Sequence, residues 1–424
     1  MEKFDIIVIG AGPAGSAAAI AAASGGLSVL LTERGRAPGD KNLFGGRIYD
    51  HALKRLGIKL DDLPYERYVN REMLALMDET HCTVLDFFDC SGARGCSFVA
   101  RRSKFDSWLA SKAEEAGAIL VPSTRVESLS LKDGKVTGIR AGGETIECSC
   151  VIDAEGVTAT LARQAGVRRD VLPSDVKIGV KETVQLDGNK INERFNLKED
   201  EGAAFVAIGY PSRYMTAGGG FIYTNKDSLS IGLVLDAEEV SSKKIEVQSL
   251  IEDFRQHPYI QRLVSGGQII EYSAHMIPSF HPAPEDLIAD GFMVAGDAGG
   301  FFINHGYTYR GVDMAIASGM CAGKAAMEAH SAGDFSKKSL SAYTRELSSE
   351  IFPELAASDR TYKLLHNPRL FSLYPPSVSC LLSSLYTIDG FGEKGVKSAF
   401  EKCMRGKISM FALARDLYSL YRNM

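Results

Sequence analysis

The 424-residue sequence predicts an α/β fold in which a parallel sheet with flanking helices is joined to an antiparallel sheet and followed by a helical region. Two observations support this prediction. Residues 4–33 form an apolar strand, a glycine turn, a helix of small residues and a second strand, which together make a β-α-β unit. Residues 176–284 instead contain short strand-like runs separated by polar turns.

The change of pattern along the chain sets the predicted domain boundaries. Residues 1–175 and 285–335 form the first domain, because an apolar strand of the first type returns at 292–296. Residues 176–284 form the antiparallel-sheet domain, with a helix expected over 244–256, and residues 336–424 form the helical C-terminal region. A chain of 424 residues suits two interlocked domains.

The composition argues against several classes of function. The formal net charge of −5 gives no support for nucleic-acid binding. No run of about 18 apolar residues is present, so the sequence predicts a cytoplasmic protein without a membrane-spanning helix. The eight cysteines contain no C-x-x-C pair, so we expect free or buried thiols and no metal site.

The turn after the first strand carries the pattern G-x-G-x-x-G, in which Gly10, Gly12 and Gly15 surround Pro13 and Ala14. The first glycine permits the tight turn, the second lets a pyrophosphate approach the backbone, and the third lets helix and strand pack closely. The N–H groups and the dipole at the helix N-terminus favour the negative pyrophosphate. The pattern therefore predicts a Rossmann-like dinucleotide site.

A carboxylate stands at the end of the second strand of this unit. Glu33 can accept hydrogen bonds from both ribose hydroxyls and would repel a 2′-phosphate. We place the adjacent Arg34 in the predicted site, together with Val126 at the start of an expected β-meander over 126–152.

Three later segments identify the dinucleotide as FAD. Arg102 precedes Phe-Asp at the head of a helix, where FAD enzymes of this fold commonly place a cofactor contact. Ala154 and Gly156 enclose a glutamate in a short acidic motif that ends a strand. The third and strongest segment follows at 292–302.

In this third segment the apolar run ends in Gly296 and Asp297. The aspartate can bind the ribityl hydroxyls of a flavin. A helix that begins near Gly311 would point its N-terminus toward the flavin pyrimidine edge and stabilise negative charge on the reduced ring. The predicted first domain is thus a Rossmann-like FAD-binding domain of the glutathione reductase and p-hydroxybenzoate hydroxylase type.

The loop over residues 41–49 interrupts the periodic pattern. We expect Gly45 and Gly46 to let the backbone approach the isoalloxazine. Lys41 and Arg47 either contact the flavin or a substrate, or are solvated charges; the sequence leaves both interpretations open.

These motifs resemble the FixC family of flavoprotein dehydrogenases, which are related to electron-transfer flavoprotein–quinone oxidoreductase. The resemblance covers most of residues 1–330. It depends on the segments GAGPAGSAAA at 10–19, KNLFGGRIY at 41–49, RRSKFDSWL at 101–109, GFIYTNKDSLSIGL at 220–233, EYSAHMIP at 271–278 and VAGDAGGF at 294–301. It implies one FAD, electrons arriving from an electron-transfer flavoprotein of the FixA/FixB type, and electrons leaving toward a quinone.

The resemblance also implies a ferredoxin-like partner of the FixX type. A [4Fe–4S] cluster needs about four thiolates, whereas Cys380 and Cys403 are the only cysteines in the C-terminal region. Any cluster must therefore lie on a separate subunit.

The loop after the Gly-Asp motif supplies the candidate catalytic residues. His305 and Tyr307 lie in a segment expected to face the flavin, with Gly306 as a cofactor contact between them. We predict that His305 donates protons during reduction of the quinone or the flavin. His275 and His281 flank a proline-rich connection and are expected to be structural.

Alternative functions stay open. A geranylgeranyl reductase shares the glycine turn and the Gly-Asp motif, but its substrate-domain signature contains a tryptophan, and the single tryptophan here is Trp108. An aromatic hydroxylase and a non-enzymatic flavin-bearing subunit are further alternatives. The apolar stretch 365–389 either covers the core or offers a platform for a quinone tail, a partner or peripheral membrane contact.

Overall fold

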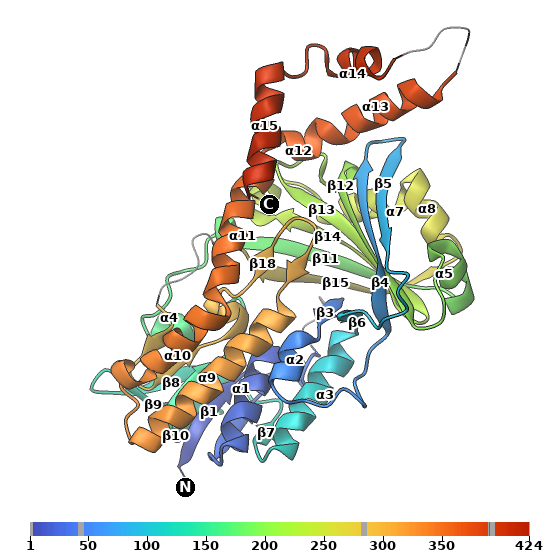
Figure 1. Ribbon diagram of the computed structural model, residues 1–424. Coiled ribbons are helices and arrows are strands. Elements are labelled where there is room, and N and C mark those ends of the chain that lie inside the picture. Colours follow the sequence, from blue (N-terminus) through green and yellow to red (C-terminus); the bar gives the residue numbers. More distant parts are fainter. Residues whose placement is uncertain (1–2, 41–45, 281–285, 389, 391–394, 424) are drawn as a thin grey trace.

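The computed structural model of the protein describes residues 3–40, 46–280, 286–388, 390 and 395–423. The protein consists of a parallel sheet with flanking helices, a second and larger sheet, and a helical C-terminal region (Figure 1). The predicted α/β fold class is therefore confirmed.

The first sheet has β1 (Phe4–Ile9) at its centre. This strand pairs in parallel with β2 and β10, and β10 pairs in parallel with β17. A continuous apolar run suits a strand that is buried on both faces. Ile6 and Val8 belong to the core with α1 and α9, and Ile7 and Ile9 pack in the core that includes Leu129 of β8 and Ile139 of β9. The other strands of this sheet are β2 (Val29–Thr32), β7 (Ile119–Val121), β8 (Val126–Lys132), β9 (Lys135–Ala141), β10 (Glu144–Asp153), β16 (Ile288–Ala289) and β17 (Phe292–Val294). The antiparallel hairpins β8–β9 and β9–β10 confirm the predicted meander.

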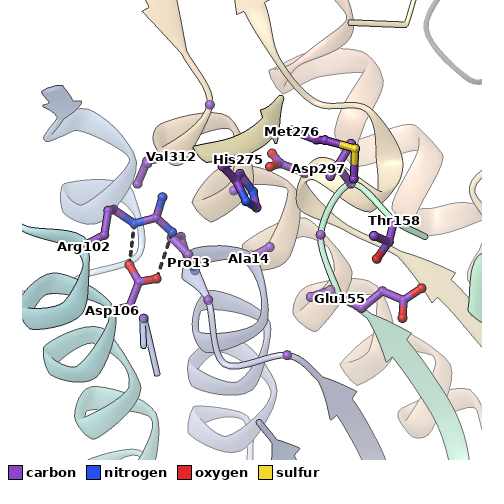
Figure 2. A pocket seen from close by; sticks show the side chains of 18 of the residues that line it. Pro13, Ala14, Arg102, Asp106, Glu155, Thr158, His275, Met276, Asp297 and Val312 are labelled. Carbon is purple, nitrogen blue, oxygen red and sulfur yellow. Dashed lines mark hydrogen bonds and ion pairs between the residues drawn. The ribbon is translucent and has the colours of Figure 1, made fainter. Parts of the chain in front are cut away.

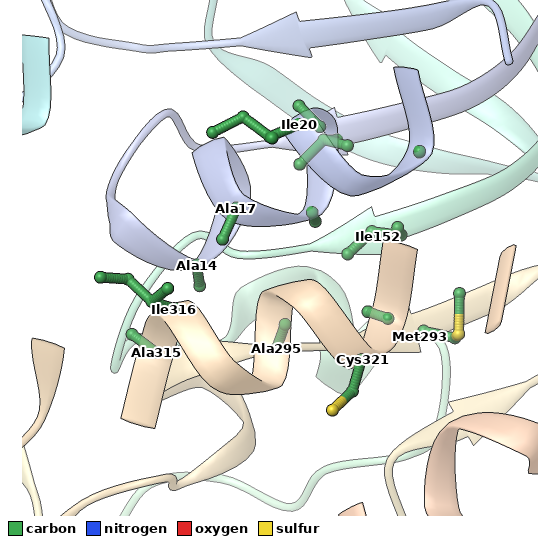
Figure 3. Close-up of a cluster of buried hydrophobic side chains, with 14 of the residues drawn as sticks. Ala14, Ala17, Ile20, Ile152, Met293, Ala295, Ala315, Ile316 and Cys321 are labelled. Carbon is green, nitrogen blue, oxygen red and sulfur yellow. The ribbon is translucent and has the colours of Figure 1, made fainter. Parts of the chain in front are cut away.

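Helix α1 (Pro13–Ser24) packs tightly against helix α9 (Val312–Ala332), because small residues line their contact. A Cβ added at Gly319 would lie only 2.0 Å from the carbonyl oxygen of Ala14. Figure 3 shows Ala14 of α1 beside Ala315 of α9 over the apolar strands of the parallel sheet. This packing brings the N-termini of two helices from distant parts of the chain to the same edge of the sheet.

The second sheet has nine strands in the order β15-β11-β14-β13-β12-β4-β6-β3, with β5 paired to β4. Their bounds are β3 (Arg47–Tyr49), β4 (Arg67–Met77), β5 (Cys82–Phe88), β6 (Ser97–Val99), β11 (Val176–Gln185), β12 (Glu201–Gly209), β13 (Gly218–Thr224), β14 (Ser228–Asp236) and β15 (Gln268–Pro278). The sequence assigned residues 47–99 to the first domain, whereas the structure gives them four strands of this sheet. The reason is that β4 pairs in parallel with β12, more than 100 residues later, and no local pattern reveals such a pairing.

Helices cover the face of the second sheet that is turned away from the parallel sheet. Helix α7 corresponds to the predicted helix at 244–256 and buries Leu250, Ile251 and Phe254 against the sheet. These helices are α5 (Gly188–Phe195), α6 (Ala237–Ser242), α7 (Val247–Gln256) and α8 (Pro258–Val264).

The C-terminal region is helical, as predicted. Its helices are α10 (Lys337–Glu350), α11 (Phe352–Leu365), α12 (Arg369–Ser372), α13 (Tyr374–Tyr386), α14 (Val396–Met404) and α15 (Met410–Asn423). A disulfide joins Cys380 of α13 to Cys403 of α14, so the expectation of free thiols is wrong for these two residues, which helix packing brings together. Within the described ranges, no helix is long and apolar enough to cross a membrane.

Candidate functional site

A cavity of about 510 Å³ lies where the carboxyl ends of the parallel strands meet the second sheet. Its walls come from the β1–α1 turn, the ends of β2 and β10, the first turn of α3 (Arg102–Glu115), the N-terminus of α9, and strands β13 to β15. Figure 2 shows Arg102 of α3, Asp297 after β17 and His275 of β15 around this space. In open α/β sheets, this edge is where ligands bind.

The glycine turn has the geometry that the sequence predicts. Gly10 has a φ of +97°, and a Cβ there would lie 2.4 Å from the carbonyl oxygen of Ala154. A Cβ at Gly15 would lie 1.8 Å from the carbonyl oxygen of Gly10, so Gly15 supports the turn from below rather than lining the cavity. Gly12, Pro13 and Ala14 do line it, and no side chain caps α1 within the described chain. The helix N-terminus is thus open to an anionic ligand.

Glu33 is held in place by the backbone around it. Its carboxylate accepts hydrogen bonds from the backbone N–H of Ala11 at 3.1 Å and of Gly35 at 2.6 Å, and it also lines the cavity. Arg34 and Val126 also line the cavity, and their contact with a cofactor stays a prediction. No sequence motif marks the neighbouring cavity residues Thr124, Arg125 and Glu127, because they lie in an irregular turn and at a strand start.

The acidic motif after β10 also reaches the cavity. Ala154, Glu155 and Gly156 all line it, and the Glu155 carboxylate accepts a hydrogen bond from the backbone N–H of Leu161. Burial is the largest influence on the Glu155 carboxyl and raises its pKa.

Arg102 and Asp106 form a buried ion pair on the first turns of α3. The guanidinium Nε and one terminal nitrogen donate to the two carboxylate oxygens at 2.7 and 2.8 Å (Figure 2). Burial lowers the pKa of Arg102, but the carboxylate of Asp106 outweighs this effect, so the pKa is raised overall. Arg102 therefore faces the cavity as a permanent cation with a fixed orientation.

Asp297 follows Gly296 at the end of β17. Gly296 has a φ of +66° and packs against Ala14 of α1, so it lies behind the cavity while Asp297 lines it. The Asp297 carboxylate has no hydrogen-bond partner among the described residues. Burial raises its pKa to about 6, although Arg102 acts in the opposite direction. Gly311 lines the cavity next to it and begins α9.

This donor and acceptor set fits FAD. Glu33 is oriented for ribose hydroxyls, the open N-terminus of α1 suits a pyrophosphate, and the unpartnered Asp297 suits the hydroxyls of a ribityl chain. A Cβ at Gly12 would meet no protein atom within 4 Å, so the glycine keeps open a space that faces the cavity.

The second sheet contributes a wall that the sequence did not predict. Phe221, Tyr223, Val234, His275 and Ile277 project from β13, β14 and β15 into the cavity. Alternation along the strands puts these side chains on one face of the sheet, whereas Ile222 and Leu233 on the opposite face belong to the core under α7. Met276, near the end of β15, also lines the cavity. His275 is therefore a cavity residue and not the structural residue that was expected. Burial and the nearby cations Arg102 and Arg34 lower its pKa to about 4, so the imidazole is neutral at pH 7.

The 41–49 loop is described from residue 46 onward, so Lys41 and Gly45 lie outside the described residues. Gly46 lines the cavity, and a Cβ there would lie 2.5 Å from the ring of Tyr223. Arg47 also lines the cavity, but it is ion-paired with Glu72 and donates to Ser97, so it is not a solvated charge.

His305, Gly306 and Tyr307 do not line the cavity. They form the turn between β18 (Ile303–Asn304) and β19 (Tyr309–Arg310), which directs them toward α11 or into solvent. His305 contacts Thr361 at 3.4 Å, and the Tyr307 side chain is half exposed. Tyr309, in the strand that follows, enters the cavity instead. The geometry thus gives no support to the predicted catalytic pair.

Family models and similar proteins agree with an FAD site in this cavity. A family model described as FAD dependent oxidoreductase matches residues 5–207, and one described as ETF-QO, ubiquinone-binding matches residues 177–277. The model of the ETF-QO/FixC family C-terminal domain matches residues 362–424. Protein FixC of Escherichia coli K12 is 42% identical over 397 residues, which cover 92% of each chain. The chain belongs to the FixC/ETF-QO family.

A further relative and two solved structures are also similar to this chain. The probable electron transfer flavoprotein-quinone oxidoreductase YdiS of E. coli K12 is 40% identical over 421 residues, covering 98% of this chain and 97% of YdiS. A geranylgeranyl bacteriochlorophyll reductase-like protein from Thermoplasma acidophilum superposes with a TM-score of 0.76 over the full length of both chains, at 21% identity. The brominase Bmp2 has a TM-score of 0.64 at 18% identity, with 99% of each chain covered. These two structures share the fold alone.

The predicted family, the FAD cofactor and the oxidoreductase class are therefore confirmed. The protein is an FAD-dependent enzyme of the ETF–quinone oxidoreductase type, and residues 177–277 match the ubiquinone-binding model of that family. The roles of individual cavity residues toward FAD stay predictions.

Proposed function

We propose that this protein takes electrons from an electron-transfer flavoprotein of the FixA/FixB type and passes them to a quinone. One observation carries the proposal: the segment that matches the ubiquinone-binding model, residues 177–277, is the segment whose strands β13 to β15 form one wall of the cavity. A ferredoxin-like subunit of the FixX type is a further partner in this proposal.

In this proposal the residues of the chain bind FAD, orient it and shield it from water. When bound, FAD supplies a redox centre that can exchange electrons singly or in pairs. Glu33 and the N-terminus of α1 would hold its adenosine and pyrophosphate ends, and Asp297 would accept hydrogen bonds from its hydroxyls. The aromatic wall of Phe221 and Tyr223 would exclude water from the reacting ring.

The test is anaerobic reduction of the purified FAD-loaded protein. We compare a reduced FixA/FixB-type flavoprotein, NADH and NADPH as donors, and then add a short-chain ubiquinone. Fast reduction by the flavoprotein, followed by reoxidation by the quinone, is the expected result. Rapid reduction by NADPH with no response to the flavoprotein contradicts the proposal. Reduction of a geranylgeranyl lipid with dithionite as reductant would favour the prenyl reductase that shares this fold.

We also propose that α15 contacts the membrane in which a quinone resides. Phe411, Tyr418 and Tyr421 are 80%, 62% and 86% exposed, and Arg415 and Arg422 lie on the same helix. A helix that combines exposed aromatic side chains with arginines suits an anionic lipid surface. Co-sedimentation with vesicles that contain phosphatidylglycerol, and none with neutral vesicles, is the expected result. Replacing Phe411 and Tyr421 with serine should abolish it.

A further inference from the structure

The face of the second sheet that borders the cavity carries a buried lysine. Lys181 of β11 is only 8% exposed. Its ammonium pairs with the carboxylate of Glu271 on β15 at 3.5 Å, and the hydroxyl of Thr183 donates to the same carboxylate at 3.2 Å. A lysine is rarely buried unless its charge has a partner, so this pair needs an explanation.

The strand register puts Lys181 next to the cavity wall. Lys181 stands opposite Gly232 on β14 and Ser273 on β15. One diagonal neighbour on each strand, Val234 and His275, lines the cavity. Diagonal neighbours in an antiparallel sheet lie roughly 7–8 Å apart, within reach of a long side chain.

A third cavity residue covers the far side of Gly232. A Cβ at Gly232 would lie 2.3 Å from the ring of Phe221, so this ring occupies the space next to Lys181. Wall residues therefore border the lysine on two sides, while Glu271 holds its ammonium on the third.

The electrostatic surroundings make Lys181 a better proton donor than a surface lysine. Burial lowers the pKa of Lys181, and Glu271 acts in the opposite direction. The cations Arg101, just before α3, and Arg102, on its first turn, lower this pKa further. The Glu271 side chain is 37% exposed and so connects the buried ammonium to water. Donors with pKa values shifted toward neutrality are typical of acid catalysis.

We propose that Lys181, held by Glu271, donates protons to the quinone that docks against this face of the second sheet. The inference deepens the function proposed above and rests on it. The electron-transfer flavoprotein delivers electrons without hydride, so the protons of the quinol must come from another source.

The overall step balances with water as the source of protons. Two reduced flavoproteins each lose one electron, and one quinone gains two electrons and two protons to become a quinol. For each proton, an N–H bond of Lys181 breaks and an O–H bond of the quinol forms. A proton from water, passed through Glu271, restores the ammonium.

The experiment separates proton supply from electron transfer. FAD-loaded wild type and the variants Lys181→Met and Glu271→Gln are photoreduced without oxygen, and flavin reoxidation is followed by stopped flow. One acceptor is a short-chain ubiquinone, which takes up protons. The other is ferricenium, which takes one electron and no proton. The matched control is Lys177→Met, because Lys177 is an equally buried lysine on the same strand face and pairs with Asp236 at 2.5 Å.

We expect Lys181→Met to slow the ubiquinone reaction by about 100-fold or more, the usual range for loss of an acid catalyst. Its ferricenium rate should equal that of the wild type, which also shows that the flavin site is intact. Glu271→Gln should slow only the ubiquinone reaction, and Lys177→Met should slow neither.

Three results would overturn the inference. Equal slowing of both acceptors by Lys181→Met would mean that the lysine supports the fold or the flavin. An unchanged ubiquinone rate would mean that protons arrive by another route. A wild-type enzyme that reacts with ferricenium but not with ubiquinone would overturn the proposed function, and the inference with it.

Discussion

Replacing Asp297 with asparagine should stabilise the protein without FAD and weaken its hold on FAD. The pKa of Asp297 is raised from an ordinary value of 3.8 to about 6, chiefly by burial. Each pH unit of such a shift corresponds to about 1.4 kcal/mol, so the ionised carboxylate destabilises the apoprotein by up to roughly 3 kcal/mol at neutral pH. Asparagine has nearly the same shape and carries no charge.

The sign of the pH dependence follows from the direction of the shift. Because the pKa is higher in the folded protein, protonation favours folding, and the cost is absent below about pH 4. The destabilisation by the ionised carboxylate grows between about pH 4 and 6 and is fully present above that range. The advantage of Asp297→Asn should therefore be largest at pH 7.5 and about half as large at pH 5.

Urea denaturation of the apoprotein at both pH values measures this difference, and titration with FAD measures the affinity. Loss of a charge-assisted hydrogen bond costs about 1.5–3 kcal/mol, which corresponds to a 10- to 100-fold higher Kd for FAD. A variant that is less stable than the wild type at pH 7.5, or one whose advantage does not shrink at pH 5, would refute the reasoning. So would unchanged FAD affinity.

Three further predictions concern other parts of the cavity. Gly12→Ala should fold normally and lose FAD affinity. Gly15→Ala should impair folding, because the new Cβ would lie 1.8 Å from a backbone oxygen. Circular dichroism measures folding of each variant, and FAD titration measures its affinity. Arg102→Met should destabilise the protein by about 3–5 kcal/mol by leaving a buried carboxylate unpaired, and adding Asp106→Leu should restore most of the loss in urea denaturation. His305→Asn should leave FAD affinity and the rate of ubiquinone reduction within about twofold of the wild type, since the His305 ring lies outside the cavity. A larger loss in either assay would show that His305 takes part in binding or catalysis.

Local patterns were sufficient for the parts of the site that come from one short stretch of chain. The glycine turn, Glu33 and the Gly-Asp motif each lie at a strand end, where backbone geometry and residue type alone limit what can bind. The structure accordingly finds Gly12, Glu33 and Asp297 on the cavity wall.

The same reasoning failed for residues whose direction depends on tertiary contacts. His305 and Tyr309 lie four residues apart, yet the β18–β19 hairpin turns the first toward α11 and the second into the cavity. A one-residue change of register reverses which side chains face the site, and sequence patterns do not determine register in a short hairpin.

The sequence by itself determined the FAD-binding unit and the family, because these depend on contacts within about 30 residues and on motifs at strand ends. Only the tertiary structure decided what faces the cofactor. The pairing of β4 with β12, and of β11 with β14 and β15, joins segments far apart in the chain. That pairing brings His275 to the cavity and Lys181 beside it, because the alternation of a strand sets which residues share a face, whereas packing decides which face meets the site.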